Sequence, residues 1–343
     1  MDFSGRKSGI KAFTAVNLAM AHMAAVLFKP FNPVRWLKFG VIGFLVYMGQ
    51  GGFNINVPWQ GDTNKWAASG PPDFNHIFQW CKDNMAIIIA VAAAIVLLIT
   101  VVWIVWLYLS SRFSFVLIDG VVKKDLRIRE YYRARRAEGW SYFLWRMGFL
   151  GVILPVVLIA AVPAAVAIFF IIKQFSVGLL LLVIASILFF LAVLILSAIV
   201  GMLTDDFVLP IMTLFGLKSM KAWGVLWSLI KSDTKSFIYY LLVKLLMAIC
   251  AAIAAITVSC LIMALAMLPG LAILGLITLA QSTPLLYIII VPLALVLMVF
   301  FGLLTQTVFA PITVFFRSFS LLFLEGFGPE FLTVNRPQSN ISG

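Results

Sequence analysis

The sequence predicts an all-α protein: a single integral membrane domain with about six transmembrane helices and additional helices at the membrane surface. Three observations predict this class: the composition, the length of the apolar runs, and the placement of lysine and arginine. Of the 343 residues, 63% are hydrophobic and 11% are charged, and the mean hydropathy is +1.10. Soluble proteins carry about 25% charged residues. Because a water-soluble fold could not hide so much apolar surface, we expect lipid to surround most of the chain.

Six segments are long and apolar enough to span a bilayer, which takes about 20 mostly apolar residues. They are residues 36–53, 85–109, 141–172, 177–202, 237–267 and 286–310. The third and fifth are longer than a bilayer core requires, so we expect tilting, kinking or projection into water. Pro155 and Pro163 are the expected kink sites in the third span, and Pro292 in the sixth.

The connections between these spans differ in length. Lys173-Gln174 is the only link between the third and fourth spans, which predicts an antiparallel hairpin. Residues 54–84 form a long loop with turn residues on the outside of the membrane. Residues 269–285 are apolar but too short to span and are expected to form a half-helix on the outer face. Whether residues 269–285 or 10–28 enter the membrane is left open by the sequence.

The distribution of basic residues predicts the orientation. Twenty of the 25 lysines and arginines lie in segments that are inside if the N-terminus is inside, and only Lys65, Lys82 and Lys173 lie outside. Short cytoplasmic segments are enriched in these residues, so we expect both termini in the cytoplasm. The net charge of +12 then reflects topology and requires no nucleic-acid partner. Attraction to anionic lipid headgroups, about 1 kcal/mol per basic residue near the surface, is a secondary interpretation.

Residues 217–231 have an amphipathic pattern at helical spacing. Lys218, Lys221 and Ser228 share one face, while Met220, Trp223, Trp227 and Ile230 share another. This pattern is typical of a helix in the plane of the membrane interface. An ordinary helix packed on its neighbours fits the same pattern equally well.

Short motifs after every second span indicate an internal repeat. They are Phe115-Val116-Leu117-Ile118-Asp119, Phe207-Val208-Leu209-Pro210-Ile211 and Phe309-Ala310-Pro311-Ile312. Repeated motifs of this kind predict three units, each a surface helix followed by a helical hairpin. The expected units are residues 1–110, 111–203 and 204–310, followed by a cytoplasmic tail at 311–343.

Two longer stretches carry a resemblance. One is Arg112-Phe113-Ser114-Phe115-Val116-Leu117-Ile118-Asp119-Gly120-Val121-Val122, followed by Gly139-Trp140-Ser141-Tyr142-Phe143; the other is Asp206-Phe207-Val208-Leu209-Pro210-Ile211-Met212, followed by Ala222-Trp223. Together they resemble a family of uncharacterised prokaryotic multi-spanning membrane proteins, which is similar to the membrane domain of some glycerophosphodiester phosphodiesterases. The resemblance implies a fold type in a prokaryotic cytoplasmic membrane and transfers no catalytic residue, because no soluble region here could hold a catalytic barrel.

Burying a charge in a membrane costs about 2.5–3.5 kcal/mol on insertion scales, so ionisable residues within the spans are rare and often functional. The ionisable residues within or beside the spans are therefore the candidate site residues. Lys244, Arg146 and Arg112 are candidates for binding a lipid or another anion, with snorkelling of the long side chains to the interface as the alternative. Asp119, Asp205 and Asp206 could bind a cation or relay protons. Helix capping, or pairing of these carboxylates with Arg146 or Lys244, is the alternative for them.

No pattern indicates a cofactor, a metal site or a catalytic centre. His22 and His76 lack partners at ligand spacing, and Cys81, Cys250 and Cys260 form no C-x-x-C pair. The expected function is therefore non-enzymatic organisation of lipids or partner proteins, with membrane lipids, other membrane proteins or further copies of this chain as partners. A transporter or channel for a small solute or lipid is the alternative. An intramembrane enzyme is a third hypothesis, and it lacks a recognisable nucleophile.

Overall fold

The computed structural model describes residues 12–48, 79, 82, 84–173, 176–280 and 284–334. Within these ranges every regular element is a helix and none is a strand, which confirms the predicted all-α class. Five helical segments of this part of the chain are long and apolar enough to cross a membrane, by length and composition. They are formed by α5 (Met85–Lys123), α7 (Arg136–Lys173), α8 (Val177–Leu203), α11 (Thr234–Ala280) and α12 (Tyr287–Val308).

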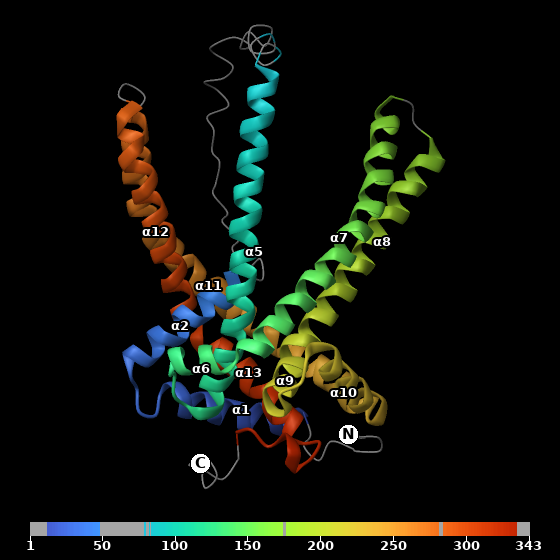
Figure 1. Ribbon diagram of the computed structural model, residues 1–343, viewed down its shortest axis with the longest axis vertical. Helices are drawn as coiled ribbons and strands as arrows, with labels where there is room; N and C mark the ends of the chain where they lie inside the picture. The colour runs from blue at the N-terminus through green and yellow to red at the C-terminus, as the bar shows by residue number, and fades with distance from the viewer. Residues whose placement is uncertain are drawn as a thin grey trace.

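These helices form three arms that rise from a common base and diverge (Figure 1). Of the described residues, α5 alone makes the first arm, the α7–α8 hairpin makes the second, and α11 with α12 makes the third. The hairpin agrees with the short link predicted between the third and fourth spans. The base comprises the roots of the arms together with the short helices α1 (Ala12–Leu27), α2 (Pro33–Met48), α6 (Ile128–Ala134), η1 (Thr204–Val208), α9 (Leu209–Phe215), α10 (Ser219–Ser232), α13 (Ala310–Glu325) and η3 (Pro329–Phe331).

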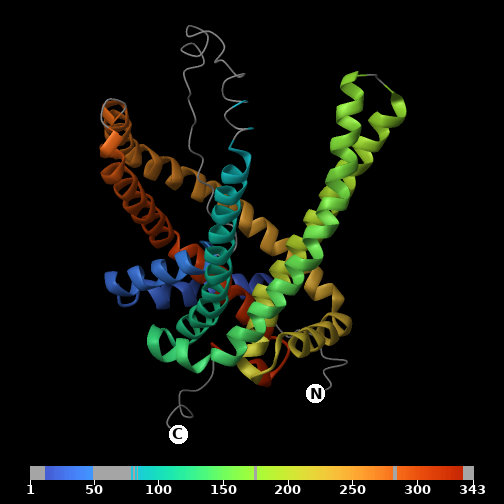
Figure 2. The ribbon, with the colours of Figure 1, turned by 45° about the horizontal axis from the view of Figure 1, so that its top comes forward.

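Helix α11 is one continuous helix of 47 residues, about 70 Å long at 1.5 Å per residue. Figure 2 shows it running obliquely from the base beside α10 to the tip that it shares with α12. Residues 269–280 therefore continue α11, and the separate half-helix expected from Pro269 does not form over them. α7 likewise continues through Pro155 and Pro163, and α12 through Pro292. Proline is tolerated in such helices because neighbouring helices and small local adjustments compensate for the missing N–H.

The predicted first span is represented by α2, which is 16 residues long and shorter than a typical span. Residues 49–53 of that predicted span lie outside the described residues, as does the predicted outer loop at 54–84 apart from Gln79, Lys82 and Asn84. Gly40 of α2 packs directly on α12: a Cβ atom there would lie 2.7 Å from the Cα atom of Thr307. This close approach holds α2 against the root of the third arm.

The hydrophobic core lies in the base. Phe207, Phe319, Phe323 and Tyr240 are fully buried, and the Tyr240 ring lies 4.8 Å from that of Phe319 and 4.6 Å from that of Phe323. Helix α13, buried along most of its length, lies at the centre of this core. The sequence assigned residues 311–343 to a tail, but residues 311–325 of that stretch belong to α13. Their aromatic and leucine side chains provide the apolar surface on which α1 and η1 pack.

Burial changes abruptly where each arm enters the base. In α5 the side chains are exposed or half-buried from Met85 to Trp106, and burial begins at Leu107. The outer stretch of about 22 residues is about 33 Å long, close to the thickness of a bilayer core. Burial begins at Thr204 after α8 and at Ala310 after α12. Each of the three repeated motifs thus lies where an arm joins the base, while the repeat itself stays a prediction.

Two short helices of the base cover stretches that the sequence singled out. Helix α1 lies across the base, not along an arm, in both views (Figures 1 and 2). Helix α10 packs through Ser219, Ala222, Leu226 and Leu229, whereas Met220 and Trp227 are exposed. Of the predicted apolar face of residues 217–231, Trp223 and Ile230 pack partly buried against the core while Met220 and Trp227 do not, so the buried face is turned relative to the predicted one.

Candidate functional site

Charged side chains from three elements converge where α8 ends. The chain leaves α8 through η1, a π-helical turn that contains Asp205 and Asp206. Single π-helical turns within longer helices are rare overall, and those that occur often lie at functional sites. The two neighbouring carboxylates of this turn have different partners.

Asp206 faces α11. Its Oδ2 atom accepts a hydrogen bond of 2.8 Å from the Tyr240 hydroxyl and forms an ion pair with the Lys244 ammonium group. Tyr240 and Lys244 are four residues apart, so they lie on one face of the helix. Both charged side chains are largely buried. This ion pair is one of the alternatives that the sequence left open for the carboxylates.

Asp205 faces α7 and α13. Its Oδ1 atom accepts a 2.8 Å hydrogen bond from the Tyr142 hydroxyl, and its backbone carbonyl accepts one from the Arg317 guanidinium of α13. Arg317 is buried and is the single basic residue of α13. From the sequence, Arg317 was identified only as one of the basic residues in the segments predicted to be cytoplasmic. A single arginine in the apolar run at 310–324 was the signal that could have found it.

A cavity of about 300 Å³ lies among these groups, at the junction of the base with the second and third arms. Its ionisable lining consists of Asp205, Asp206, Lys244 and Arg317. The hydroxyl-bearing side chains of Tyr47 and Thr313 complete its polar surface. Two carboxylates and two cations balance each other here. The arrangement can therefore accept a polar or zwitterionic guest without a net charge.

Arg146 occupies the neighbouring root of α7. Its guanidinium donates hydrogen bonds to the hydroxyls of Ser110 (3.1 Å) and Ser111 (3.5 Å) on α5 and lies 5.5 Å from the centre of the Tyr142 ring. It lines a second cavity of about 460 Å³, and Asp205 lines both cavities. The structure therefore brings together four of the six predicted site residues: Arg146, Asp205, Asp206 and Lys244.

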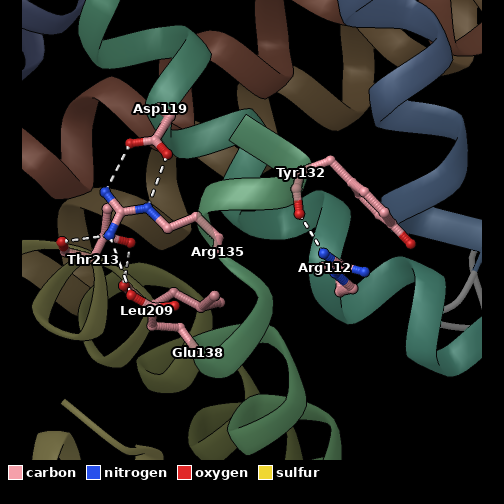
Figure 3. A network of polar contacts seen from close by, with 7 residues as sticks. All are labelled: Arg112, Asp119, Tyr132, Arg135, Glu138, Leu209 and Thr213. Carbon is pink, nitrogen blue, oxygen red and sulfur yellow. Dashed lines mark hydrogen bonds and ion pairs between the residues drawn. The ribbon is translucent and has the colours of Figure 1, made fainter. Parts of the chain in front are cut away.

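The other two predicted residues belong to a separate network in the base (Figure 3). Arg135 donates to both oxygens of Asp119, over 3.0 and 3.2 Å, and to the carbonyl of Thr213, over 3.1 Å. Burial disfavours the charged form of Arg135, but Asp119 and Glu138 outweigh burial and raise the pKa of the guanidinium above its ordinary value. Asp119 thus joins α5 to the segment before α7.

Arg112 also has a local partner (Figure 3). Its guanidinium donates to the carbonyl of Tyr132 and lies 3.6 Å from the centre of the Tyr132 ring. Gly139 allows this approach of α5 and α7, since a Cβ atom there would lie 2.7 Å from Cγ of Arg112. Arg112 lines neither of the cavities above and holds α6 against α5.

No group of three or more metal-ligating side chains occurs within the part of the chain that the structure describes. His22 is buried and hydrogen-bonded to the Ser318 hydroxyl over 2.9 Å, in agreement with the prediction of a packed histidine.

Comparison with known protein families shows the family of this chain. A family model described as a family of unknown function, DUF7544, matches residues 10–334, nearly the whole chain. The chain belongs to this family. Searches of curated proteins and of solved structures found no match. The expected likeness to an uncharacterised family is thus confirmed.

Proposed function

We propose that this protein is a non-enzymatic membrane protein that organises lipids or partner proteins in the cytoplasmic membrane, with both ends in the cytoplasm. The observation that carries the proposal is the exposure of the arms. The most apolar 18-residue windows of the five candidate spans are 0–6% buried within the protein. Apolar surface on this scale is covered by lipid or by other membrane proteins.

Charge supports this orientation. The described basic residues, apart from Lys82 and Lys173, lie in the base or at the roots of the arms, and such residues favour the cytoplasmic side. Tryptophans that favour membrane interfaces also gather at this level, among them Trp36, Trp140, Trp145 and Trp223. We also propose that the fold type resembles that of the membrane domain of glycerophosphodiester phosphodiesterases.

Co-purification in a mild detergent, followed by mass spectrometry of the intact assembly, tests this function. We expect a stoichiometric protein partner or a retained class of lipid. The second arm of the test is reconstitution of the purified protein into liposomes, where we expect no solute flux above that of protein-free liposomes. Reproducible flux through liposomes that contain this protein alone would contradict the organising role.

A transporter is the second candidate, favoured by the 300 Å³ cavity and its four charged side chains at the roots of the arms. Charged groups inside membrane proteins often mark a solute or proton pathway. If the protein transports, Lys244→Ala should abolish flux, because it removes a cation that lines the cavity. Exposed Lys221 of α10 is the matched control, and Lys221→Ala should leave flux unchanged. Equal flux in both variants would argue against this route.

A further inference from the structure

The second cavity changes in polarity along the arms. It lies between the roots of α5, α7 and α8 and has a volume of about 460 Å³. Its base end is polar, with Arg146, Tyr142, Thr204 and Asp205. Its other end, farther along the arms, is apolar, with Trp103, Phe149, Leu150 and Ala198. The order follows from chain direction: α7 runs away from the base from 142 to 150, and α8 runs towards it from 198 to 205.

Helical spacing places these side chains on single faces. Residues 142, 145, 146, 149 and 150 follow the i, i+3, i+4, i+7, i+8 pattern on α7, and residues 198, 201, 202 and 205 follow it on α8 and η1. Both faces turn to the same cavity. The polarity change is thus built into two helices independently.

The base end of the second cavity carries one cation, Arg146, and one carboxylate, Asp205, while Lys244, Arg317 and Asp206 line the neighbouring first cavity. The ionisable residues that line the two neighbouring cavities are Arg146, Lys244 and Arg317 against Asp205 and Asp206. Summed over both cavities, three cations against two carboxylates leave an excess of one positive charge around this partly desolvated junction. Such an excess favours an anion, and arginine is well suited to hold a phosphate.

We propose that this cavity binds an anionic membrane phospholipid, with its phosphate group at Arg146 and the start of its acyl chains against Trp103, Phe149 and Leu150. The proposal deepens the function proposed above, on which it rests, by placing a lipid at a defined site. A soluble phosphate would leave the apolar end of the cavity without a partner, whereas a phospholipid fills both ends. The bound lipid would join the α5 arm to the α7–α8 arm.

A glycine in the cavity wall allows a test that leaves the charges intact. Gly201 lines the cavity, and a Cβ atom there meets nothing within 4 Å, so a leucine side chain fits the backbone and fills the cavity. Gly151 of α7 also has open space around it but does not line the cavity. Gly201→Leu and Gly151→Leu are therefore matched in chemistry and differ only in place.

The measurement is native mass spectrometry of the purified full-length protein titrated with phosphatidylglycerol, phosphatidylcholine, diacylglycerol or inorganic phosphate. We expect phosphatidylglycerol to bind at least tenfold more tightly than phosphatidylcholine or diacylglycerol. Gly201→Leu should weaken phosphatidylglycerol binding at least tenfold, and Gly151→Leu should not. Arg146→Gln should also weaken it about tenfold, whereas Arg136→Gln, at an exposed arginine of the same helix, should not.

Several outcomes would overturn the assignment: Gly201→Leu that binds phosphatidylglycerol like the wild type, diacylglycerol bound as tightly as phosphatidylglycerol, or inorganic phosphate bound as tightly as the lipid. Thermal unfolding of each variant separates loss of the site from loss of the fold. Failure here leaves the organising role standing if the protein still retains a partner and conducts no solute. Conversely, solute flux in liposomes would overturn that role even if lipid binding at the cavity were measured.

Discussion

The base and the arms of this protein use apolar residues in opposite ways. In the base, aromatic rings pack against one another and buried carboxylates pair with cations, as Asp206 does with Lys244 and Asp119 with Arg135. In the arms, leucine, isoleucine and phenylalanine point outwards along almost the whole length of each helix. The difference teaches that the stability of the isolated protein resides in the base, while the arms depend on the surrounding membrane.

The largest expected effect on stability comes from removing a buried aromatic ring from the base. Phe207 is fully buried, and its ring centre lies 5.3 Å from that of Phe237 and 4.9 Å from that of Tyr240. Phe207→Ala should lower the free energy of unfolding by about 3–5 kcal/mol. Leu196→Ala, at a residue 63% exposed on α8, is the control and should change it little. Thermal unfolding in detergent measures the stability of both variants. Equal losses of stability would contradict the proposed difference between base and arms.

The buried ion pair provides the next test. Lys244→Met should lower the free energy of unfolding by about 3 kcal/mol, because Asp206 is left charged and buried with only the Tyr240 hydroxyl. The double variant Lys244→Met/Asp206→Asn should recover much of that loss, since no buried charge then lacks a partner. Chemical denaturation of the four proteins forms a double-mutant cycle. Additive effects would show that the two side chains do not interact.

A smaller effect is expected where α2 meets α12. Gly40→Ala should cost about 1–3 kcal/mol, because the added Cβ atom would lie 2.7 Å from the Cα atom of Thr307 and the two helices must separate. At Gly43, one turn further along α2, the nearest contact of a Cβ atom would be an ordinary 3.7 Å. Gly43→Ala should therefore be neutral or slightly stabilising. Equal melting temperatures for the two variants would argue against a close contact of α2 with α12.

A further effect, confined to acidic pH, concerns the base alone. Burial, together with the positive charge of Lys124, lowers the pKa of His22 from 6.5 to about 4, and its Nε2 atom is buried without a hydrogen-bond partner among the described residues. As the pH falls, His22 therefore becomes protonated in the unfolded chain at a higher pH than in the folded chain. Stability from neutral His22 is fully present above pH 6.5 and is lost as the pH falls through about 4. Melting temperatures of wild type and His22→Gln should differ in slope over this window; parallel curves would exclude His22 as the cause.

The sequence by itself determined the helical class, five of the spans and the hairpin of α7 and α8. These features depend on local patterns: the length of an apolar run and the residues of a short link. The sequence also singled out Lys244, Asp206 and Arg146, because a charge within an apolar run is visible without a structure.

Only the tertiary structure decided how these pieces meet. Arg317 and Asp205 are 112 positions apart, and Tyr142 and Asp205 are 63 positions apart on the two sides of the hairpin, so no local pattern could pair them. The central place of α13 was equally hidden, since a run of aromatic residues after the last span reads the same whether lipid or protein covers it. Apolar periodicity reports that a face avoids water, but only the fold decides whether protein or lipid covers it.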